Sequence, residues 1–518
     1  MRGAGWLCGI GVAGCGGPPP VPARVVFLDG ALRVEGPAAA SLPGGRGVPG
    51  GVLVERAWAP GEQVEVAGVV HTAPPAPQCE ALFAVALGDA RATVAAGNFP
   101  EAALAFSPDG ARLAVGTEEG ALRVLDAWTG AVLAERVLPE AAVKQVAWSV
   151  DGGLLFVSEQ SPDATLHALD PSSLAPRWSR RLADDVESSA PPAAGDVYGA
   201  WTLPAGYGLG ALPDGGVLVA AAHAWAGADG ATQNRSVLLR LGADGGVQAR
   251  WPASGAADTV LRALAVDPGG RAAVTVNRSA AGTPAPGTPP DGVLVFDVAS
   301  LQPGASVVPA PLPPWFPAPF VWEALDVSGE RLGLGLGDGR VQLYGADGGL
   351  LATHAPGAPL LAGEVPIHAS VGWGRFVGGD FVVAISGTLI PWGAASPDLR
   401  PPSPHPEART VRAFGPDGAP GWSFTTDAEP QGLSVAPGGG WLAVGLGVAS
   451  GAAAALDGGY GALRLRPGAA PQPVRCPTRG PVFFRHALAQ DGRLAVVEGP
   501  VLGAGQIVEG AWRVVVLR

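Results

Sequence analysis

A short pattern of apolar strands and tight turns recurs along most of this chain, and it restricts the possible folds more than any other feature. In the clearest copy, apolar runs lie at 103–106, 111–116, 121–126 and 132–137. The first turn is Ser107-Pro108-Asp109-Gly110, in which Pro presets φ and Gly supplies the positive φ that reverses the chain. Four antiparallel strands in about 40 residues are typical of one blade of a β-propeller.

The third run of this unit returns along the rest of the chain. Its copies lie at 121–126, 166–170, 237–241, 293–297, 341–344, 411–414, 463–465 and 514–517. The hairpin formed by the first two runs returns less regularly, in seven copies and a degenerate one near 371–386. We therefore predict an all-β fold, a β-propeller of about eight four-stranded blades, with seven blades as the alternative.

Two short motifs in the first unit resemble those of known propeller families. The turn sequence FSPDG at 106–110 and the later LD…TG pattern at 125–130 are similar to the WD40 and YVTN-type repeats. The resemblance covers roughly residues 91–518 and implies a fold rather than a function. Most copies lack the Trp-Asp and Gly-His pairs of those families, so we expect a divergent propeller.

The last copy of the unit ends on its third strand, so its blade needs an outer strand from elsewhere in the chain. An unpaired outer edge would invite aggregation. The segment 91–96 precedes the first unit and has no third strand of its own. We expect this segment to close the ring as the outer strand of the final blade.

The N-terminus has the pattern of an export signal. Met1-Arg2 is followed by an apolar stretch and then by the sequence VAGC at 12–15, which resembles the bacterial lipobox. The resemblance implies that residues 1–14 are removed as a signal peptide and that Cys15 is lipidated. Residues 15–22 would then form a tether. We expect an exported protein of the cell envelope, periplasmic or on the outer surface, that contacts the membrane only through its lipid anchor.

Two regions follow the predicted tether. Residues 23–78 contain short strand-like runs without blade spacing, which predict a small β-sandwich-like domain, and residues 79–518 hold the propeller. If Cys8 leaves with the signal and Cys15 is acylated, two cysteines remain. An even pair in an exported protein predicts a disulfide between Cys79 and Cys476.

Charge and motif content argue against several functions. The formal net charge is −12, and the 33 basic residues include a single lysine, Lys144. A phosphate-binding surface needs clustered Lys and Arg, so no nucleic-acid partner is predicted. The chain has no serine-hydrolase elbow, zincin motif or EF-hand loop, and its cysteines lack metal-site spacing, so neither a cofactor nor a metal is predicted.

Long connections gather at one end of the predicted blades. Those between second and third strands lie at 223–235, 278–291, 386–408, 447–460 and 499–510, and those between outer and next inner strands at 182–205, 305–319 and 355–367. In a propeller both kinds of connection emerge on the same face. We call this end the insertion face and predict that it is the binding face, because insertions collected on one face usually mark it.

Aromatic and histidine side chains on or beside these insertions are the candidates for contact with a partner. They are Trp201, Tyr207, His223, Trp225, Trp315, Phe316, Trp392, His405 and Tyr460. Exposed aromatic rings anchor protein partners and sugar rings. The same rings could instead fold back and fill gaps between blades.

The favoured function is a non-catalytic scaffold that binds a protein or a glycan. A related alternative is a subunit similar in architecture to eight-bladed outer-membrane assembly lipoproteins. The third is a propeller enzyme of the lactonase, sulfotransferase or quinoprotein type with an axial active site. In that case His223, His368 and His405 could converge on the axis.

Overall fold

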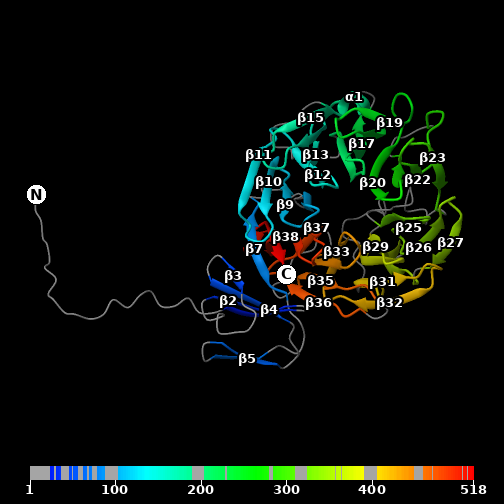
Figure 1. The fold of residues 1–518 in the computed structure, drawn as a ribbon. Helices are drawn as coiled ribbons and strands as arrows, with labels where there is room; N and C mark the ends of the chain where they lie inside the picture. The colour runs from blue at the N-terminus through cyan, green and yellow to red at the C-terminus, as the bar shows by residue number, and fades with distance from the viewer. Residues whose placement is uncertain are drawn as a thin grey trace, which may run out of the picture. The chain divides into compact units, whose positions relative to one another are not determined.

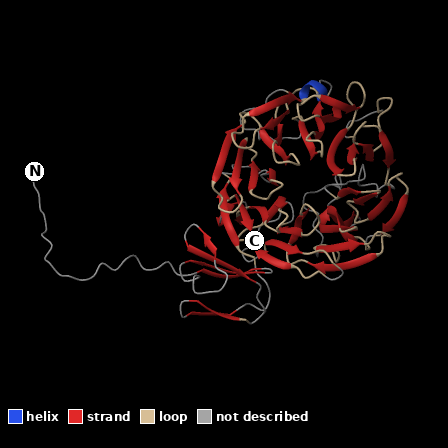
Figure 2. Ribbon diagram, viewed as in Figure 1, coloured by secondary structure: helices blue, strands red, loops and turns tan. Residues whose placement is uncertain are grey.

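The computed structural model describes residues 24–28, 31–36, 46–48, 51–56, 62–66, 69–72, 79–87, 103–189, 203–227, 230–278, 284–309, 324–355, 357–362, 365–389, 405–448, 459–468, 471–503, 506–509 and 511–518. The chain divides into two compact units, Met1–Glu80 and Ala81–Arg518. Strands dominate both units, as Figure 2 shows.

The N-terminal compact unit, Met1–Glu80, contains a four-stranded antiparallel sheet and a separate hairpin. The sheet has the order β1-β2-β4-β3, and β5 pairs with β6. The bounds of the strands are β1 (Arg24–Leu28), β2 (Ala31–Gly36), β3 (Arg46–Val48), β4 (Gly51–Arg56), β5 (Gln63–Val66) and β6 (Val69–Thr72). The sandwich expected over residues 23–78 stays a prediction.

The second compact unit, Ala81–Arg518, is a ring of antiparallel sheets around a central opening (Figure 1). We call each four-stranded repeat of this ring a unit. The first units along the ring are β8 (Ala103–Phe106), β9 (Arg112–Gly116), β10 (Ala121–Asp126) and β11 (Val132–Val137); β12 (Ala142–Trp148), β13 (Leu155–Gln160), β14 (Thr165–Leu169) and β15 (Pro176–Arg181); and β16 (Ala205–Ala211), β17 (Val217–Ala226), β18 (Thr232–Leu241) and β19 (Val247–Trp251). In each unit the first strand lies nearest the opening and the fourth lies on the outside (Figure 1).

The ring continues in the same up-and-down order. Its next units are β20 (Val260–Asp267), β21 (Arg271–Asn277), β22 (Gly292–Asp297) and β23 (Pro303–Val307); β24 (Leu325–Ser328), β25 (Arg331–Gly335), β26 (Val341–Gly345) and β27 (Leu350–His354); and β29 (Val365–Val377), β30 (Asp380–Leu389), β31 (Thr410–Phe414) and β32 (Pro420–Thr425). The last are β33 (Glu429–Val435), β34 (Leu442–Gly447), β35 (Gly461–Leu465) and β36 (Val474–Pro477), then β37 (Val482–Leu488), β38 (Leu494–Glu498), β41 (Arg513–Leu517) and β7 (Ala81–Ala86).

This arrangement confirms the predicted all-β propeller of four-stranded antiparallel units. Each third run that the sequence predicts overlaps the third strand of one unit, from β10 to β41. The Pro-Asp-Gly turn forms as expected, with Gly110 at φ 68°. The Ser107 hydroxyl donates to Asp109 Oδ1 at 2.5 Å. That hydrogen bond lowers the pKa of Asp109 and holds the turn.

The closing strand is β7, and the assignment of that role to 91–96 is wrong. β7 pairs with β41 in register, with Val85 opposite Val514 and Phe83 opposite Val516. Segment 91–96 lies outside the described residues. The expectation rested on the position of 91–96 directly before the first unit. β7 has the features that the outer strand of the final unit requires. Its Phe83 and Val85 pack on the neighbouring core, and its alternate residues are exposed, as on other outer strands.

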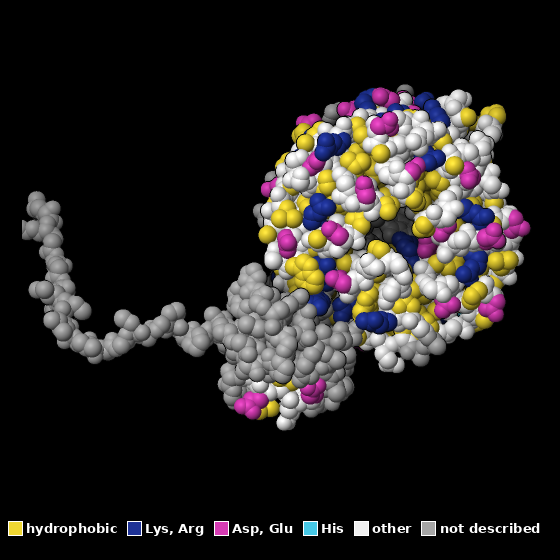
Figure 3. Space-filling view, viewed as in Figure 1, with side chains coloured by type: hydrophobic (Ala, Val, Ile, Leu, Met, Phe, Trp, Pro, Cys, Tyr) yellow, Lys and Arg dark blue, Asp and Glu magenta, His cyan; other side chains and the backbone are white. Residues whose placement is uncertain are grey.

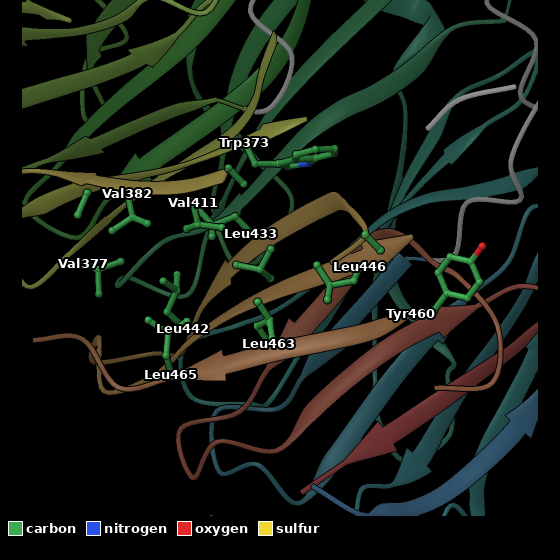
Figure 4. Packing of buried hydrophobic residues seen from close by; sticks show 14 of the residues in the cluster. Trp373, Val377, Val382, Val411, Leu433, Leu442, Leu446, Tyr460, Leu463 and Leu465 are labelled. Carbon is green, nitrogen blue, oxygen red and sulfur yellow. The ribbon is translucent and has the colours of Figure 1, made fainter. Parts of the chain in front are cut away.

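Burial of both faces of each unit explains why the units form a ring. All six residues of β13 are buried. Leu155 and Val157 pack in a cluster shared with the preceding unit, whereas Phe156 between them packs with the following unit. Figure 4 shows the equivalent packing of Trp373 and Leu433, which belong to neighbouring units. A sheet that is apolar on both faces needs a neighbour on each side.

Arginines link neighbouring units at the end opposite the insertion face, which we call the turn face. Each of them donates to the carbonyl of a turn glycine in the next unit. The bridges are Arg112 Nη2 to Gly152 O (3.3 Å), Arg271 Nη1 to Gly329 O (3.1 Å), Arg464 Nη1 to Gly492 O (2.8 Å) and Arg493 Nη2 to Gly110 O (2.6 Å). The last of these joins the final unit to the first.

Arg493 makes the most extensive of these bridges. Its side chain is 3% exposed, and Nε donates to Asp491 Oδ2 at 2.8 Å. Nη1 donates to Ala127 O at 2.9 Å, and the guanidinium lies 3.9 Å over the Trp128 ring. A planar guanidinium can serve several acceptors and stack on an indole at once, which an ammonium cannot do. Arg493 therefore links the last unit to the first, at the same junction where β7 completes the ring.

The two cysteines within the described residues are both oxidised. Cys79 lies two residues before β7, the final outer strand, and Cys476 lies in β36, the outer strand of the neighbouring unit. Each is disulfide-bonded. Their pairing with each other stays a prediction.

Replacement of Arg493 by lysine tests the closure. Arg493→Lys should lower the free energy of unfolding by about 3 kcal/mol, because lysine leaves buried carbonyls without their donor. The matched control, Arg177→Lys, changes an arginine that is 63% exposed and should cost less than about 0.5 kcal/mol. Urea denaturation followed by tryptophan fluorescence measures both. Equal stability of the two variants would contradict the role of Arg493.

Candidate binding face

The elements that extend beyond the four-stranded units lie in connections of the insertion face. The helix α1 (Ala183–Val186) and the short strand β28 (Leu360–Ala362) lie between an outer strand and the next inner strand. The hairpin of β39 (Val501–Gly503) and β40 (Gln506–Glu509) lies between the second and third strands of the last unit. The turn face carries tight turns instead, so the two ends of the ring are built differently.

The structure separates the predicted contact residues into three groups. Trp201, Trp315, Phe316 and Trp392 lie outside the described residues. Tyr207 and Trp225 are half-buried, whereas His223, His405 and Tyr460 are 1%, 3% and 7% exposed. The buried three therefore belong to the framework of the face rather than to its surface.

Tyr460 is buried rather than exposed on the insertion face, and its part in binding stays a prediction. It directly precedes β35, and its ring lies in the core cluster that also contains Leu446 and Val501 (Figure 4). Its ring fills space next to a strand end, which is the alternative that the sequence leaves open. A large ring beside an apolar strand gains more from burial than from exposure.

A long hairpin presents Trp225 on the insertion face. β17 and β18 have ten residues each. The rings of His223 and Trp225 stack at a centroid distance of 4.4 Å and an interplanar angle of 25°. Buried His223 thereby supports one side of the indole. At the base of β18, the hydroxyls of Ser236 and Thr259 are hydrogen-bonded at 2.7 Å and tie the hairpin to the next unit.

Buried polar side chains gather at the strand ends of the insertion face. Each member of the group is less than 9% exposed: Glu159, Gln160, His223, Asn234, Ser236, Thr259, Asp338, His368, His405, Thr410, Glu429 and Glu498. Burial of polar groups is costly unless they are hydrogen-bonded. Several of them are satisfied within the fold, as in the Ser236–Thr259 hydrogen bond and the Arg513–Glu498 ion pair.

Two of the three histidines considered for an axial site lie close together. The ring of His405 donates from Nε2 to Ala358 O at 3.1 Å and accepts at Nδ1 from the Glu407 amide at 3.1 Å. Within the described part of the chain, neither ring nitrogen of His368 has a hydrogen-bond partner. Burial lowers the pKa of His368, and the nearby charges of Asp338 and His405 act on it as well. His223 instead stacks on an indole of β17, as described above.

Glu429 is a buried acid at the start of β33. Its side chain is 6% exposed, and Oε2 lies 3.7 Å from Arg409 Nε. Burial raises the pKa of Glu429 to about 7, and the Arg409 guanidinium offsets only part of that effect. The carboxyl therefore changes charge near neutral pH.

Inner strands carry β-bulges at nearly the same level of the ring. The bulged residues are Lys144 in β12, Tyr207 in β16, Arg262 and Ala263 in β20, Gly372 in β29, Gln431 and Gly432 in β33, and Phe484 and Arg485 in β37. A bulge turns a side chain out of the regular alternation of its strand and is common next to functional sites. Sequence reasoning missed these positions, although Lys144-Gln145 interrupts an otherwise apolar run.

In the part of the chain that the structure describes, no helix has the length and apolarity to cross a bilayer. Nor does that part of the chain bring three or more His, Cys, Asp or Glu side chains together in a way that could hold a metal ion.

Comparison with known proteins identifies the class of the repeat. Residues 97–151 match the family described as "Anaphase-promoting complex subunit 4 WD40 domain". This segment spans the first unit and the first strand of the second, including the FSPDG turn. This segment therefore matches a WD40 family, as the resemblance of that turn indicated, and the described part of residues 81–518 folds as a β-propeller. A search of curated proteins found no match.

Several solved structures share a similar strand arrangement. The C-terminal WD40 domain of Sif2 has 11% identity and a TM-score of 0.48, with 85% of this chain and 98% of that chain covered. The computationally designed Ika8 protein has 14% identity and a TM-score of 0.48, with coverages of 80% and 94%. BamB from Moraxella catarrhalis has 14% identity and a TM-score of 0.38, with coverages of 66% and 79%.

The titration of Glu429 predicts a pH-dependent stability. The folded state holds a proton that the unfolded chain releases between pH 4.5 and about 7, so stability falls as pH rises through that window. Glu429→Gln should be more stable than the wild type at pH 8, by about 3 kcal/mol at most, and similar to it below pH 4.5.

Unfolding by urea at pH 4.5, 6 and 8 measures the effect. The matched control is Glu135→Gln, which changes an acid that is 47% exposed and paired with Arg123. Its difference from the wild type should be small at every pH. A Glu429→Gln difference that is independent of pH would contradict the burial of a titrating carboxyl.

Proposed function

We propose that this protein is a non-catalytic scaffold, anchored in the cell envelope, that holds a protein or glycan partner on its insertion face. A WD40-type propeller fits a protein-binding role. Fold alone does not define a function, so the proposal depends on what the insertion face contains.

One observation carries the proposal, namely the asymmetry between the two ends of the ring. α1, β28 and the β39–β40 hairpin extend the insertion face, and β17 and β18 are lengthened there. The turn face is instead joined by arginine bridges between units. Additions that stabilise a ring would be expected at both ends, whereas additions that build a binding surface gather at one.

The chemistry of the face suits recognition. Trp225 offers a half-buried indole that His223 holds in place. Rigid aromatic side chains supply large contact areas at a low entropic cost and are frequent hot spots. The same stacking surface suits the apolar face of a sugar ring. A protein partner and a glycan therefore remain the two proposed ligands.

The anchor is proposed from the sequence of the N-terminus. Cys15 follows three small residues in the lipobox-like pattern at 12–15, and a glycine- and proline-rich stretch comes next. Acylation of this cysteine, together with removal of residues 1–14, would place the propeller at a membrane surface. A scaffold held there can present its face to other envelope components.

The binding role predicts a dependence on Trp225. A tagged chain captured from cross-linked membranes of its native host should carry a partner, and Trp225→Ala should reduce the recovery at least threefold, because a hot-spot truncation costs more than about 1 kcal/mol. Trp422→Ala is the matched control, since Trp422 is also half-buried but lies in the outer strand β32. Quantitative mass spectrometry measures the recovery, and a glycan array with the same variants tests sugars. Equal recovery with both variants would contradict the proposed face.

The anchor predicts lipid incorporation at one cysteine. Cells grown with a palmitate analogue should label the wild-type chain, and Cys15→Ser should abolish the label and release the protein from membranes. Cys8→Ser is the control, because Cys8 leaves with the signal and cannot carry the final lipid. Labelling that persists in Cys15→Ser would contradict the anchor.

A further inference from the structure

We propose that the inner rim of the ring between β12 and β20 is a carboxylate-binding site, built from Lys144, Tyr207 and Arg262, that receives an acidic segment of a protein partner. The inference rests on the proposed scaffold function and specifies the chemistry of its partner. The proposed site lies at the inner rim of the insertion face, next to the central opening, whereas the long connections lie further out.

The backbone places the three side chains next to one another. Each lies on a β-bulge of the first strand of its unit, in β12, β16 and β20. These strands follow one another around the opening (Figure 1). Each residue comes at the third position of its strand, so the bulges lie at one level near the insertion face.

Tyr207 forms the centre of the group. Lys144 Nζ lies 5.6 Å from the centroid of the Tyr207 ring, within the range of a cation–π contact. Gln160 Nε2 donates to Tyr207 Oη at 3.2 Å, and Gln145 Nε2 donates to Tyr207 O at 3.0 Å. Gln160 therefore holds the phenol hydroxyl and Gln145 holds the Tyr207 backbone, and together they keep the ring beside the Lys144 ammonium.

Arg262 supplies the second charge. It is half-buried, and burial lowers its pKa while Tyr207 raises it. A guanidinium away from bulk water interacts more strongly with an anion than one at an open surface. Its planar fork also matches the two oxygens of a carboxylate. Arg262 and Lys144 thus present a directed donor and a point charge on either side of the phenol.

The charge at these bulges indicates the partner. The bulges of β12 and β20 carry the basic residues Lys144 and Arg262, whereas the buried acids of this face, Glu159, Asp338 and Glu429, lie off the bulges. The chain as a whole carries a formal net charge of −12. The only lysine of the sequence thus lies at the inner rim. Figure 3 shows that the centre of the ring is hollowed and that a basic side chain, in dark blue, and an acidic one, in magenta, reach its edge on the face in view.

Acidic side chains fit this site better than a nucleic acid. A nucleic-acid backbone is neutralised by many cations spread along its length, and each contact adds to the salt dependence. Here the charge is confined to an axial rim next to a half-buried phenol. One or two carboxylates entering along the axis would meet both cations, and the rest of the segment would lie over the insertion face.

Binding of a fluorescein-labelled decaglutamate peptide to the purified full chain tests the inference. Fluorescence polarisation at low ionic strength should show saturable binding, and Lys144→Gln with Arg262→Gln should weaken it at least tenfold. The control pair Arg177→Gln with Arg181→Gln makes the same change of net charge on exposed arginines of β15 and should weaken it less than twofold. Lys144→Arg with Arg262→Lys keeps both charges and should retain most of the affinity, which separates loss of charge from loss of folding.

The outcomes distinguish this inference from the proposed function. Equal weakening by the rim pair and the control pair, or an equal affinity of the rim variant and the wild type, overturns the carboxylate site. An absence of decaglutamate binding to the wild type also overturns it, even where a Trp225-dependent partner is captured from membranes. Rim-dependent peptide binding without any captured partner supports the site and counts against the scaffold function instead.

Discussion

The ring depends on the pairing of β7 with β41. Each four-stranded unit is apolar on both faces, so it is stable only between two neighbours, and the first and last units must become neighbours of each other. β7 provides the outer strand that the last unit lacks. Arg493 then joins the same two units through the carbonyls of Gly110 and Ala127. A hydrogen-bonded strand and a buried guanidinium thus complete a structure that hydrophobic packing alone would leave open.

The two ends of the ring use polar groups differently. On the turn face, arginines serve turn carbonyls of the next unit, and these contacts hold the units in register. On the insertion face, buried polar groups include His368, whose ring nitrogens find no partner among the described residues, and Glu429, whose pKa is raised to about 7. Such groups weaken a fold more than they stabilise it. Their concentration where the long connections lie is consistent with a face shaped by recognition.

The sequence was sufficient for the repeat but not for the details that build the site. The FSPDG turn and the apolar third runs predicted the units, because turn chemistry and strand hydrophobicity are local. β7 was missed because an outer strand carries only weak alternation and no turn signature. The burial of Tyr460 could not be predicted, because a ring beside an insertion has the same local pattern whether it is exposed or buried. The bulges at Lys144, Tyr207 and Arg262 depend on cross-strand register, which one strand's sequence does not contain.

The bridge from Arg493 to Gly110 has a consequence for the order of assembly. These residues are 383 positions apart in the sequence, and β7 and β41 lie still further apart. At about 5–20 residues per second, roughly 20–80 s separate the synthesis of the two ends of that bridge. Through that time β7 has no strand to pair with, and its edge is open to other chains. The step that finishes the ring is therefore also the one at which a chaperone, or a second unfinished copy, competes most directly with native folding.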